Sequence, residues 1–72
     1  MREKIIELLE GVLMVSQGTI NEDTKMEDIE EWDSLAHVMI IGELEGKLGV
    51  TIPLDEAIEI TSVKDIFEKA GV

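Results

Sequence analysis

The sequence predicts an all-α fold of four helices, with a long first loop and a short third helix. Apolar residues recur at helical spacing in three stretches, at the start, in the middle and at the end of the chain. Residues that typically cap or end helices flank the second and third of these stretches. Seventy-two residues suffice for one small domain, so we expect residues 1–72 to form a single unit.

The first helix is expected at residues 2–15, where a broad apolar stripe excludes most of the acidic residues. The stripe consists of Ile5, Ile6, Leu8, Leu9, Val12 and Leu13. Glu3, Glu7 and Glu10 fall largely outside it.

Helical periodicity is lost over residues 16–32, where Gly18, Asn21 and Thr24 favour turns. So long a loop needs apolar anchors in so small a domain. The available anchors are Ile20, Met26, Ile29 and Trp32. A short helical turn is expected around residues 26–30. Trp32 is either an anchor or a contact for a partner protein.

The second helix is expected at residues 34–48, with Asp33 as its N-cap and Gly49 at its C-terminal end. One face should join the core and includes Ile40, Ile41, Leu44 and Leu48, with His37 beside them. A second apolar set should be largely exposed, because four short helices cannot cover both faces. This set comprises Leu35, Val38, Met39, Gly42 and Gly46. The alternative is that the loop at 16–32 covers part of it.

Two shorter helices are expected to follow. Pro53 favours an extended backbone at residues 50–53, and Asp55 can cap a helix near residues 56–59. Ser62 and Asp65 resemble a capping box for the last helix, which should end at Gly71. Its inward residues are expected to be Val63, Ile66, Phe67 and Ala70.

Composition narrows the function. Seventeen acidic against six basic side chains give a net charge of −11. This charge disfavours nucleic acids and anionic membranes, and it favours basic partner proteins and a soluble monomer. The chain has no cysteine, so any thiol chemistry must come from a cofactor. The N-terminal stretch lacks a continuous apolar run, so we expect no membrane insertion and a cytoplasmic location.

Catalysis and metal binding find little support. His37 lies three residues after Ser34 and suggests a Ser-His hydrolase pair, but nothing supplies an oxyanion hole or a pocket. We therefore expect no catalytic residue and no enzyme activity. The first loop carries a cluster of acidic residues that lacks the pattern of an EF-hand, so we expect no metal site there. The simplest interpretation is a solvated, negatively charged surface. The cluster comprises Glu22, Asp23, Glu27, Asp28, Glu30 and Glu31.

Ser34 stands out because it lies in the first turn of a helix, where free backbone N–H groups and the helix dipole favour a phosphate esterified to its hydroxyl. Its surroundings, Glu31-Trp32-Asp33-Ser34-Leu35, are followed by Leu44-Glu45-Gly46-Lys47-Leu48-Gly49-Val50, Ile52-Pro53 and Ile60-Thr61-Ser62-Val63-Lys64-Asp65-Ile66. Together these segments resemble the acyl carrier protein family over nearly the whole chain.

The resemblance implies an acyl-carrier type of four-helix bundle. It also implies that a phosphopantetheinyl transferase attaches 4′-phosphopantetheine from coenzyme A to Ser34, within the Asp33-Ser34-Leu35 motif. The protein would then carry acyl groups as thioesters and present them to acyl-loading and acyl-transfer enzymes with basic docking faces. The residues expected to meet these partners are Leu35, Val38, Met39, Gly42, Glu43 and Glu45.

One departure from the family concerns the face that follows Ser34. The best-known fatty-acid carriers have a more acidic and bulkier face there than Met39, Gly42 and Gly46 provide. A dedicated partner in a specialised pathway therefore fits better, while fatty-acid, polyketide, aminoacyl and glycan-decorating pathways all remain open. The alternative is an unmodified acidic helical adaptor, which would bind a basic partner through residues 34–48 and carry no cofactor.

Overall fold

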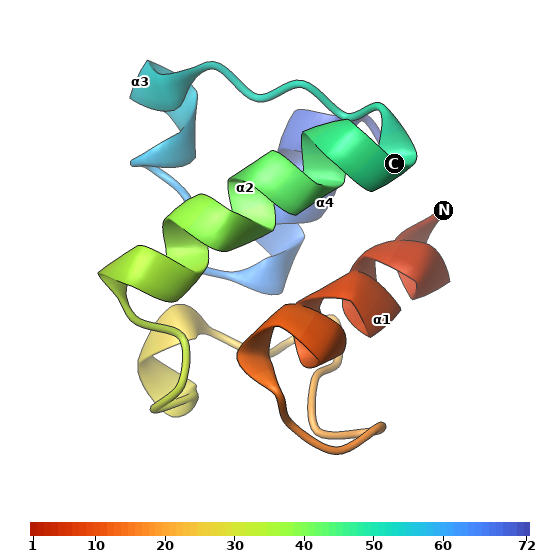
Figure 1. The fold of residues 1–72 in the computed structure, drawn as a ribbon, viewed down its shortest axis with the longest axis vertical. Coiled ribbons are helices and arrows are strands. Elements are labelled where there is room, and N and C mark those ends of the chain that lie inside the picture. The colour runs from red at the N-terminus through yellow and green to blue at the C-terminus, as the bar shows by residue number, and fades with distance from the viewer.

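Four α-helices and one 3-10 turn make up the computed structural model, which describes residues 1–72 (Figure 1). In chain order these are α1 (Arg2–Leu13), η1 (Met26–Asp28), α2 (Ser34–Leu48), α3 (Leu54–Ala57) and α4 (Val63–Ala70). The predicted all-α class, the long first loop and the short third helix are confirmed. No helix here has both the length and the apolar character that crossing a bilayer requires.

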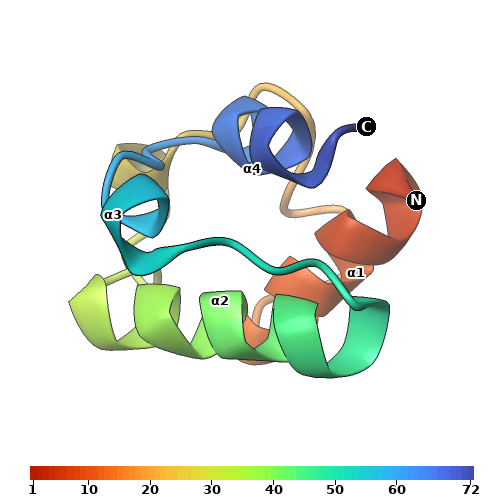
Figure 2. The same ribbon diagram turned by 90° about the horizontal axis from the view of Figure 1, so that it is seen from above.

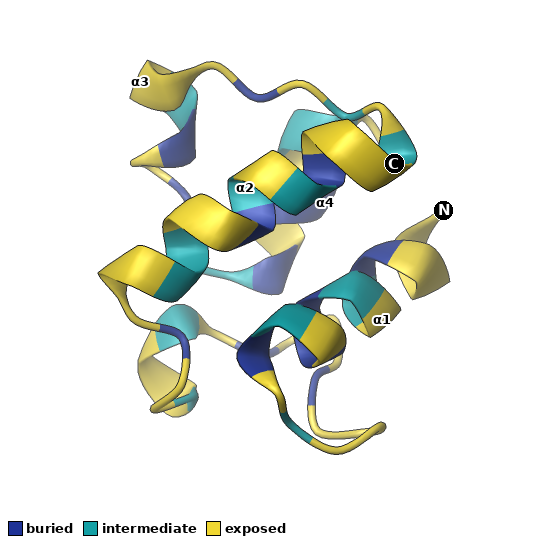
Figure 3. Ribbon diagram, viewed as in Figure 1, coloured by how far each residue is buried: buried dark blue, intermediate teal, exposed yellow.

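The helices surround a single apolar core. Seen from above, α2 runs along one side, α4 lies opposite it, and α1 and α3 flank them (Figure 2). Every α-helix and the loops contribute buried side chains: Ile5, Leu9, Leu13, Ile20, Trp32, Ile40, Leu44, Ile52, Ala57, Ile60, Val63, Ile66 and Phe67. Figure 3 shows the consequence for α2, whose inward side is buried while its outward side stays exposed.

Helix α1 ends two residues earlier than the sequence predicted. Met14 takes a left-handed conformation with φ 58°, and the helix closes through backbone bonds to the carbonyls of Glu10 and Gly11. Glu10 lies outside the apolar stripe, as predicted, but is nevertheless only 6% exposed. Its carboxylate accepts hydrogen bonds from the backbone N–H groups of Gly18 and Ile20, so it anchors the first loop.

Apolar side chains along the first loop pack into the core. Ile20 and Trp32 are buried, and Met26 and Ile29 pack against the core, which confirms the four predicted anchors. The loop also pairs with the segment before α4, because the Met26 N–H donates to the Thr61 carbonyl at 2.8 Å. The predicted helical turn is present as η1, one 3-10 turn.

Helix α2 has the predicted bounds. Asp33 is its N-cap, and Gly49 ends it with φ 68°, a backbone conformation that favours glycine. Ile40 and Leu44 are fully buried, while Ile41 and Leu48 are half-buried. The core face of α2 was therefore predicted correctly.

The third helix begins earlier than predicted. Pro53 rather than Asp55 is the N-cap of α3, because its extended ψ of 148° lets the chain turn into a helix at Leu54. Helix α4 agrees with its prediction, since Ser62 caps it and Gly71 ends it with φ 77°.

Candidate functional site

The site begins at Ser34, the first residue of α2, whose side chain is exposed. The helix starts here because the Asp33 carboxylate accepts a hydrogen bond from the Ala36 N–H at 2.9 Å. The His37 N–H donates to the Asp33 carbonyl at 2.9 Å. The serine is thus held on the end of a capped helix.

The first turn of α2 fits a phosphate ester on this serine. The protein pairs the N–H groups of Ala36 and His37, and it leaves those of Ser34 and Leu35 without a protein acceptor. Two donors at a helix N-terminus are therefore available to phosphate oxygens. The residues present accordingly suit the phosphate end of a phosphopantetheine group, which would extend from the exposed serine toward solvent.

A hydrogen-bonded bridge passes beside Ser34. The indole Nε1 of Trp32 donates to Nδ1 of His37 at 3.0 Å, and His37 Nε2 lies 2.9 Å from the carbonyl oxygen of Ala57 in α3. Both ring nitrogens of His37 are thereby engaged, so neither can serve as a base for Ser34. The sequence predicted that His37 borders the core and needs polar partners; it gave no signal for Ala57.

The outward side of α2 exposes the expected apolar side chains. Leu35 is 72% exposed, Val38 64% and Met39 52%. The first loop does not cover them, so the alternative of a covered face was wrong. Two further exposed apolar residues lie at α3: Leu54 is 77% and Ile58 is 74% exposed. The sequence analysis did not predict their exposure, because a four-residue helix carries no periodic pattern.

A groove of about 320 Å³ lies between α2 and α3. Its apolar lining comes from Val38, Ile41, Leu54, Ala57 and Ile58, and its other lining residues are His37, Gly42 and Glu45. The groove therefore joins the exposed parts of both helices one turn after Ser34.

Gly42 and Gly46 also lie on the exposed side of α2. A Cβ atom at either position would meet nothing within 4 Å, so no packing inside the protein requires these glycines. Of the two nearby acids, Glu43 is paired with Lys47 at 3.3 Å. Glu45 is exposed and has no such partner.

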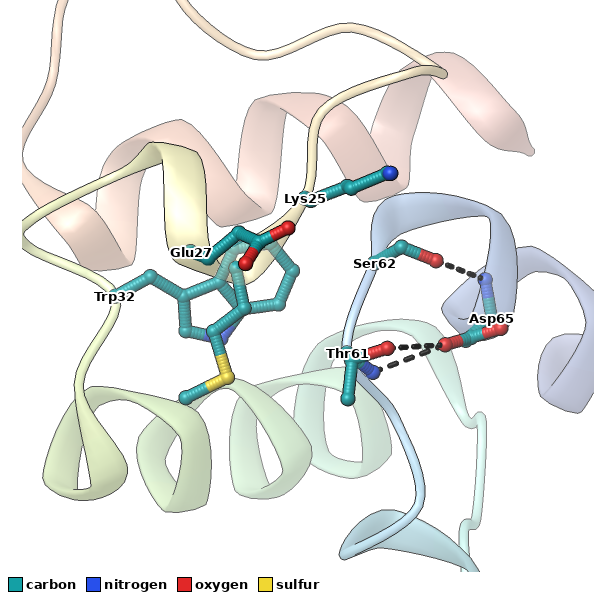
Figure 4. A pocket seen from close by; sticks show the side chains of 7 residues that line it. Lys25, Glu27, Trp32, Thr61, Ser62 and Asp65 are labelled. Atoms are coloured by element: carbon teal, nitrogen blue, oxygen red, sulfur yellow. Dashed lines mark hydrogen bonds between the residues drawn. The ribbon is translucent and has the colours of Figure 1, made fainter.

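A larger cleft of about 720 Å³ lies where the first loop meets the start of α4, and Trp32, two residues before Ser34, is one of its lining residues (Figure 4). Its polar groups bind one another: the Asp65 carboxylate accepts from the Thr61 N–H at 2.9 Å, and the Ser62 hydroxyl accepts from the Asp65 N–H at 3.2 Å. The bond from Thr61 is the main cause that holds the pKa of Asp65 below its ordinary value of 3.8. The cleft therefore lies along the contact between the first loop and the start of α4, and its polar groups are bonded to one another.

Helix α3 and the turn that follows it are tied to α4 by Lys69, whose ammonium lies 3.4 Å from Glu56 of α3 and 3.3 Å from Glu59 after it. The hydrogen bond to Glu59 is the main cause that raises the pKa of Lys69 above 10.5. No group of three acidic or histidine side chains is arranged to hold a metal ion.

Comparison with known proteins adds to this geometry. The model of the family described as "Phosphopantetheine attachment site" matches residues 3–68. The chain is 34% identical to the D-alanyl carrier protein of Listeria welshimeri serovar 6b over 55 residues, which is 76% of this chain and 70% of that protein. It is 33% identical to the D-alanyl carrier protein of Listeria innocua serovar 6a over the same shares of both chains. The comparison with solved structures gives no match.

Proposed function

The chain belongs to the phosphopantetheine-attachment family, and we propose on this premise that Ser34 is the residue to which the 4′-phosphopantetheine is joined. The single observation that carries this proposal is the exposed serine at the start of α2, beside two backbone N–H groups without a protein acceptor. Members of the family are carriers and not enzymes. The bound group supplies a thiol that holds the cargo as a thioester.

The protein's own residues keep Ser34 in place. Asp33 stabilises the helix end through its carboxylate, and Trp32 fixes the preceding loop in the core. The serine hydroxyl can therefore be presented to a transferase without local refolding. In the transfer, the serine oxygen forms a bond to phosphorus, and adenosine 3′,5′-bisphosphate leaves from coenzyme A.

We propose an aminoacyl cargo, D-alanyl, rather than a fatty acid or a polyketide. The similarity to D-alanyl carrier proteins supports this cargo. The dense core is consistent with it, because Ile40, Leu44 and Ile60 are fully buried and the groove beside α3 is open to solvent. A small, charged aminoacyl group needs no apolar shelter, whereas a long acyl chain would gain from one.

The docking surface for partner enzymes is proposed to be the exposed side of α2. Carriers of this family meet a phosphopantetheinyl transferase and the enzymes that handle their cargo. Here Leu35, Val38 and Met39 offer apolar contact, Gly42 leaves room for close approach, and Glu43 and Glu45 add negative charge. A partner with a basic rim around an apolar centre would complement this surface. The expected cytoplasmic location and single domain stay predictions.

The cargo can be tested with the phosphopantetheine-loaded protein. It is incubated with ATP and an enzyme that loads D-alanyl carrier proteins, in parallel with D-alanine, L-alanine or glycine, and intact mass is recorded. Loading with D-alanine that hydroxylamine removes supports the proposal. No loading, with an authentic D-alanyl carrier loaded in the same assay, would exclude this cargo while leaving the attachment site untouched.

A further inference from the structure

The bridge through His37 fixes the protonation state of its ring. An indole N–H can only donate and a carbonyl oxygen can only accept. Because Nδ1 of His37 accepts from Trp32 and Nε2 faces the Ala57 carbonyl, the ring must be neutral with its proton on Nε2. The two rings also stack, with centroids 6.1 Å apart and planes inclined by 27°. The geometry therefore suits one tautomer only.

The bridge joins the segment that precedes Ser34 to α3. Trp32 comes two residues before Ser34, and Ala57 is the last residue of α3. Helix α3 has few other attachments, since Ala57 is its buried residue while Leu54 and the following Ile58 are largely exposed. Besides the burial of Ala57 in the core and the ion pair of Glu56 with Lys69, the contact with His37 is the hydrogen bond that ties α3 to α2.

We propose that His37 is a positioning residue: its neutral ring couples the segment that precedes Ser34 to α3, and protonation of the ring releases α3. A protonated imidazole carries N–H on both nitrogens, so Nδ1 can no longer accept from Trp32. The indole N–H of the buried Trp32 then loses its partner, and the ring must turn or move away. Because His37 and Ala57 line the same groove, its width changes with them.

The other charged groups around the bridge are carboxylates and one lysine. Glu31 and Asp33 flank Trp32, Glu45 lines the groove with His37, and α3 contributes Asp55 and Glu56, the latter paired with Lys69. Carboxylates ordinarily titrate well below neutrality and lysine well above it. The chain contains one histidine, so a response between about pH 5 and 8 that involves a side chain reports on this ring.

The test is a nitrogen–proton NMR titration of the protein without its cofactor, from pH 8 to pH 5. The chain has one tryptophan, so a single indole cross-peak follows the Trp32 bond. Wild-type protein is compared with His37→Gln, whose amide can both accept and donate but does not titrate. Hydrogen-exchange protection, corrected for the intrinsic pH dependence, follows the amides of Ile58 and Ile60.

The expected result has three parts. In wild-type protein the indole peak moves as the pH is lowered. Hydrogen-exchange protection at Ile58 and Ile60 falls about tenfold toward pH 5, which corresponds to about 1.4 kcal/mol in the free energy of local opening. His37→Gln keeps both signals independent of pH, and the core of α1 is unaffected in either protein. An indole peak that stays fixed while the histidine ring titrates would overturn the inference. Wild-type protection at low pH that equals that at pH 8 would overturn it as well.

If Ser34 is the attachment site, as proposed above, protonation of His37 should also change the rate at which Ser34 is modified, and this rate is measured separately. The rate of phosphopantetheine transfer to wild-type protein is divided by the rate for His37→Gln at each pH, so that the transferase's own pH dependence cancels. The ratio should change as the ring protonates, and a constant ratio would refute coupling to the serine. If neither protein is modified, the proposed attachment fails, while the NMR titration still decides whether the bridge releases α3.

Discussion

The buried carboxylate of Glu10 accepts a hydrogen bond from the backbone N–H of Gly18 at 2.7 Å, across eight residues of sequence. The same oxygen also accepts from the Ile20 N–H at 3.2 Å. One acidic side chain on α1 therefore ties the start of the first loop to the core. This contact explains how a loop rich in turn residues keeps a fixed path toward Trp32 and Ser34.

Replacing Glu10 should therefore destabilise the domain. Glu10→Ala leaves two backbone N–H groups without their acceptor, so we expect the free energy of unfolding to fall by about 2–3 kcal/mol. Glu10→Gln retains one carbonyl oxygen and should cost less. Urea unfolding measures both, with exposed Glu7→Ala as the matched control, expected to change stability by less than about 0.5 kcal/mol. Equal effects of Glu7→Ala and Glu10→Ala would contradict the anchoring role.

Stability should also depend on Asp65 at acidic pH. Its pKa is lowered in the folded protein, chiefly by the hydrogen bond from the Thr61 N–H. A group with a depressed folded pKa contributes stability that is present above its unfolded value of 3.8 and is lost as pH falls through the folded value. Unfolding of wild-type and Asp65→Asn protein should thus differ at pH 7 and converge toward pH 2. A difference that stays constant over this range would argue against the assignment.

The two exposed glycines of α2 offer a test that separates stability from binding. Gly42→Ala and Gly46→Ala meet open space, so each should raise the free energy of unfolding by up to about 1 kcal/mol. If close approach by a partner requires Gly42, its alanine variant should bind the transferase more weakly although it is more stable. Thermal unfolding and a binding titration distinguish the two effects. Unchanged binding by both variants would leave the glycines without a role in docking.

Charge reversal should separate the two acids on the docking face. Glu45→Lys removes an unpaired negative charge beside the groove and should slow association with a basic partner several-fold at low salt, with little effect at high salt. Glu43 is already paired with Lys47, so Glu43→Gln should have a smaller effect than Glu45→Gln. Stopped-flow measurements at a low and a high salt concentration give the association rate of each variant, with Glu3→Lys on α1 as the control. Equal slowing by Glu3→Lys would show that net charge alone steers the encounter.

The sequence predicted those parts of the fold that depend on local signals. Asp33 and Gly49 mark the ends of α2 because capping and left-handed closure involve neighbouring residues only. The burial of Glu10 was missed because helical spacing places it on the polar side, and the amides that it binds belong to the loop. The start of α3 was missed because Pro53 itself serves as the N-cap.

Some features of the candidate site could likewise be predicted from the sequence, and others could not. Ser34 at a helix start and the exposed Leu35, Val38 and Met39 could be predicted from spacing along α2. The Ala57 carbonyl that receives His37 lies twenty residues away, and any residue type presents the same backbone oxygen. No sequence pattern could have identified that partner, so the bridge became visible only once the fold was known.

Attachment of phosphopantetheine at Ser34 is tested most directly by peptide mass analysis after incubation with coenzyme A, Mg²⁺ and a broad-specificity phosphopantetheinyl transferase. We expect one phosphopantetheine increment on the peptide that contains Ser34, and none in folded Ser34→Ala protein. No increment on folded wild-type protein, while a known carrier is modified in the same assay, would contradict the account and favour an unmodified adaptor that binds through α2.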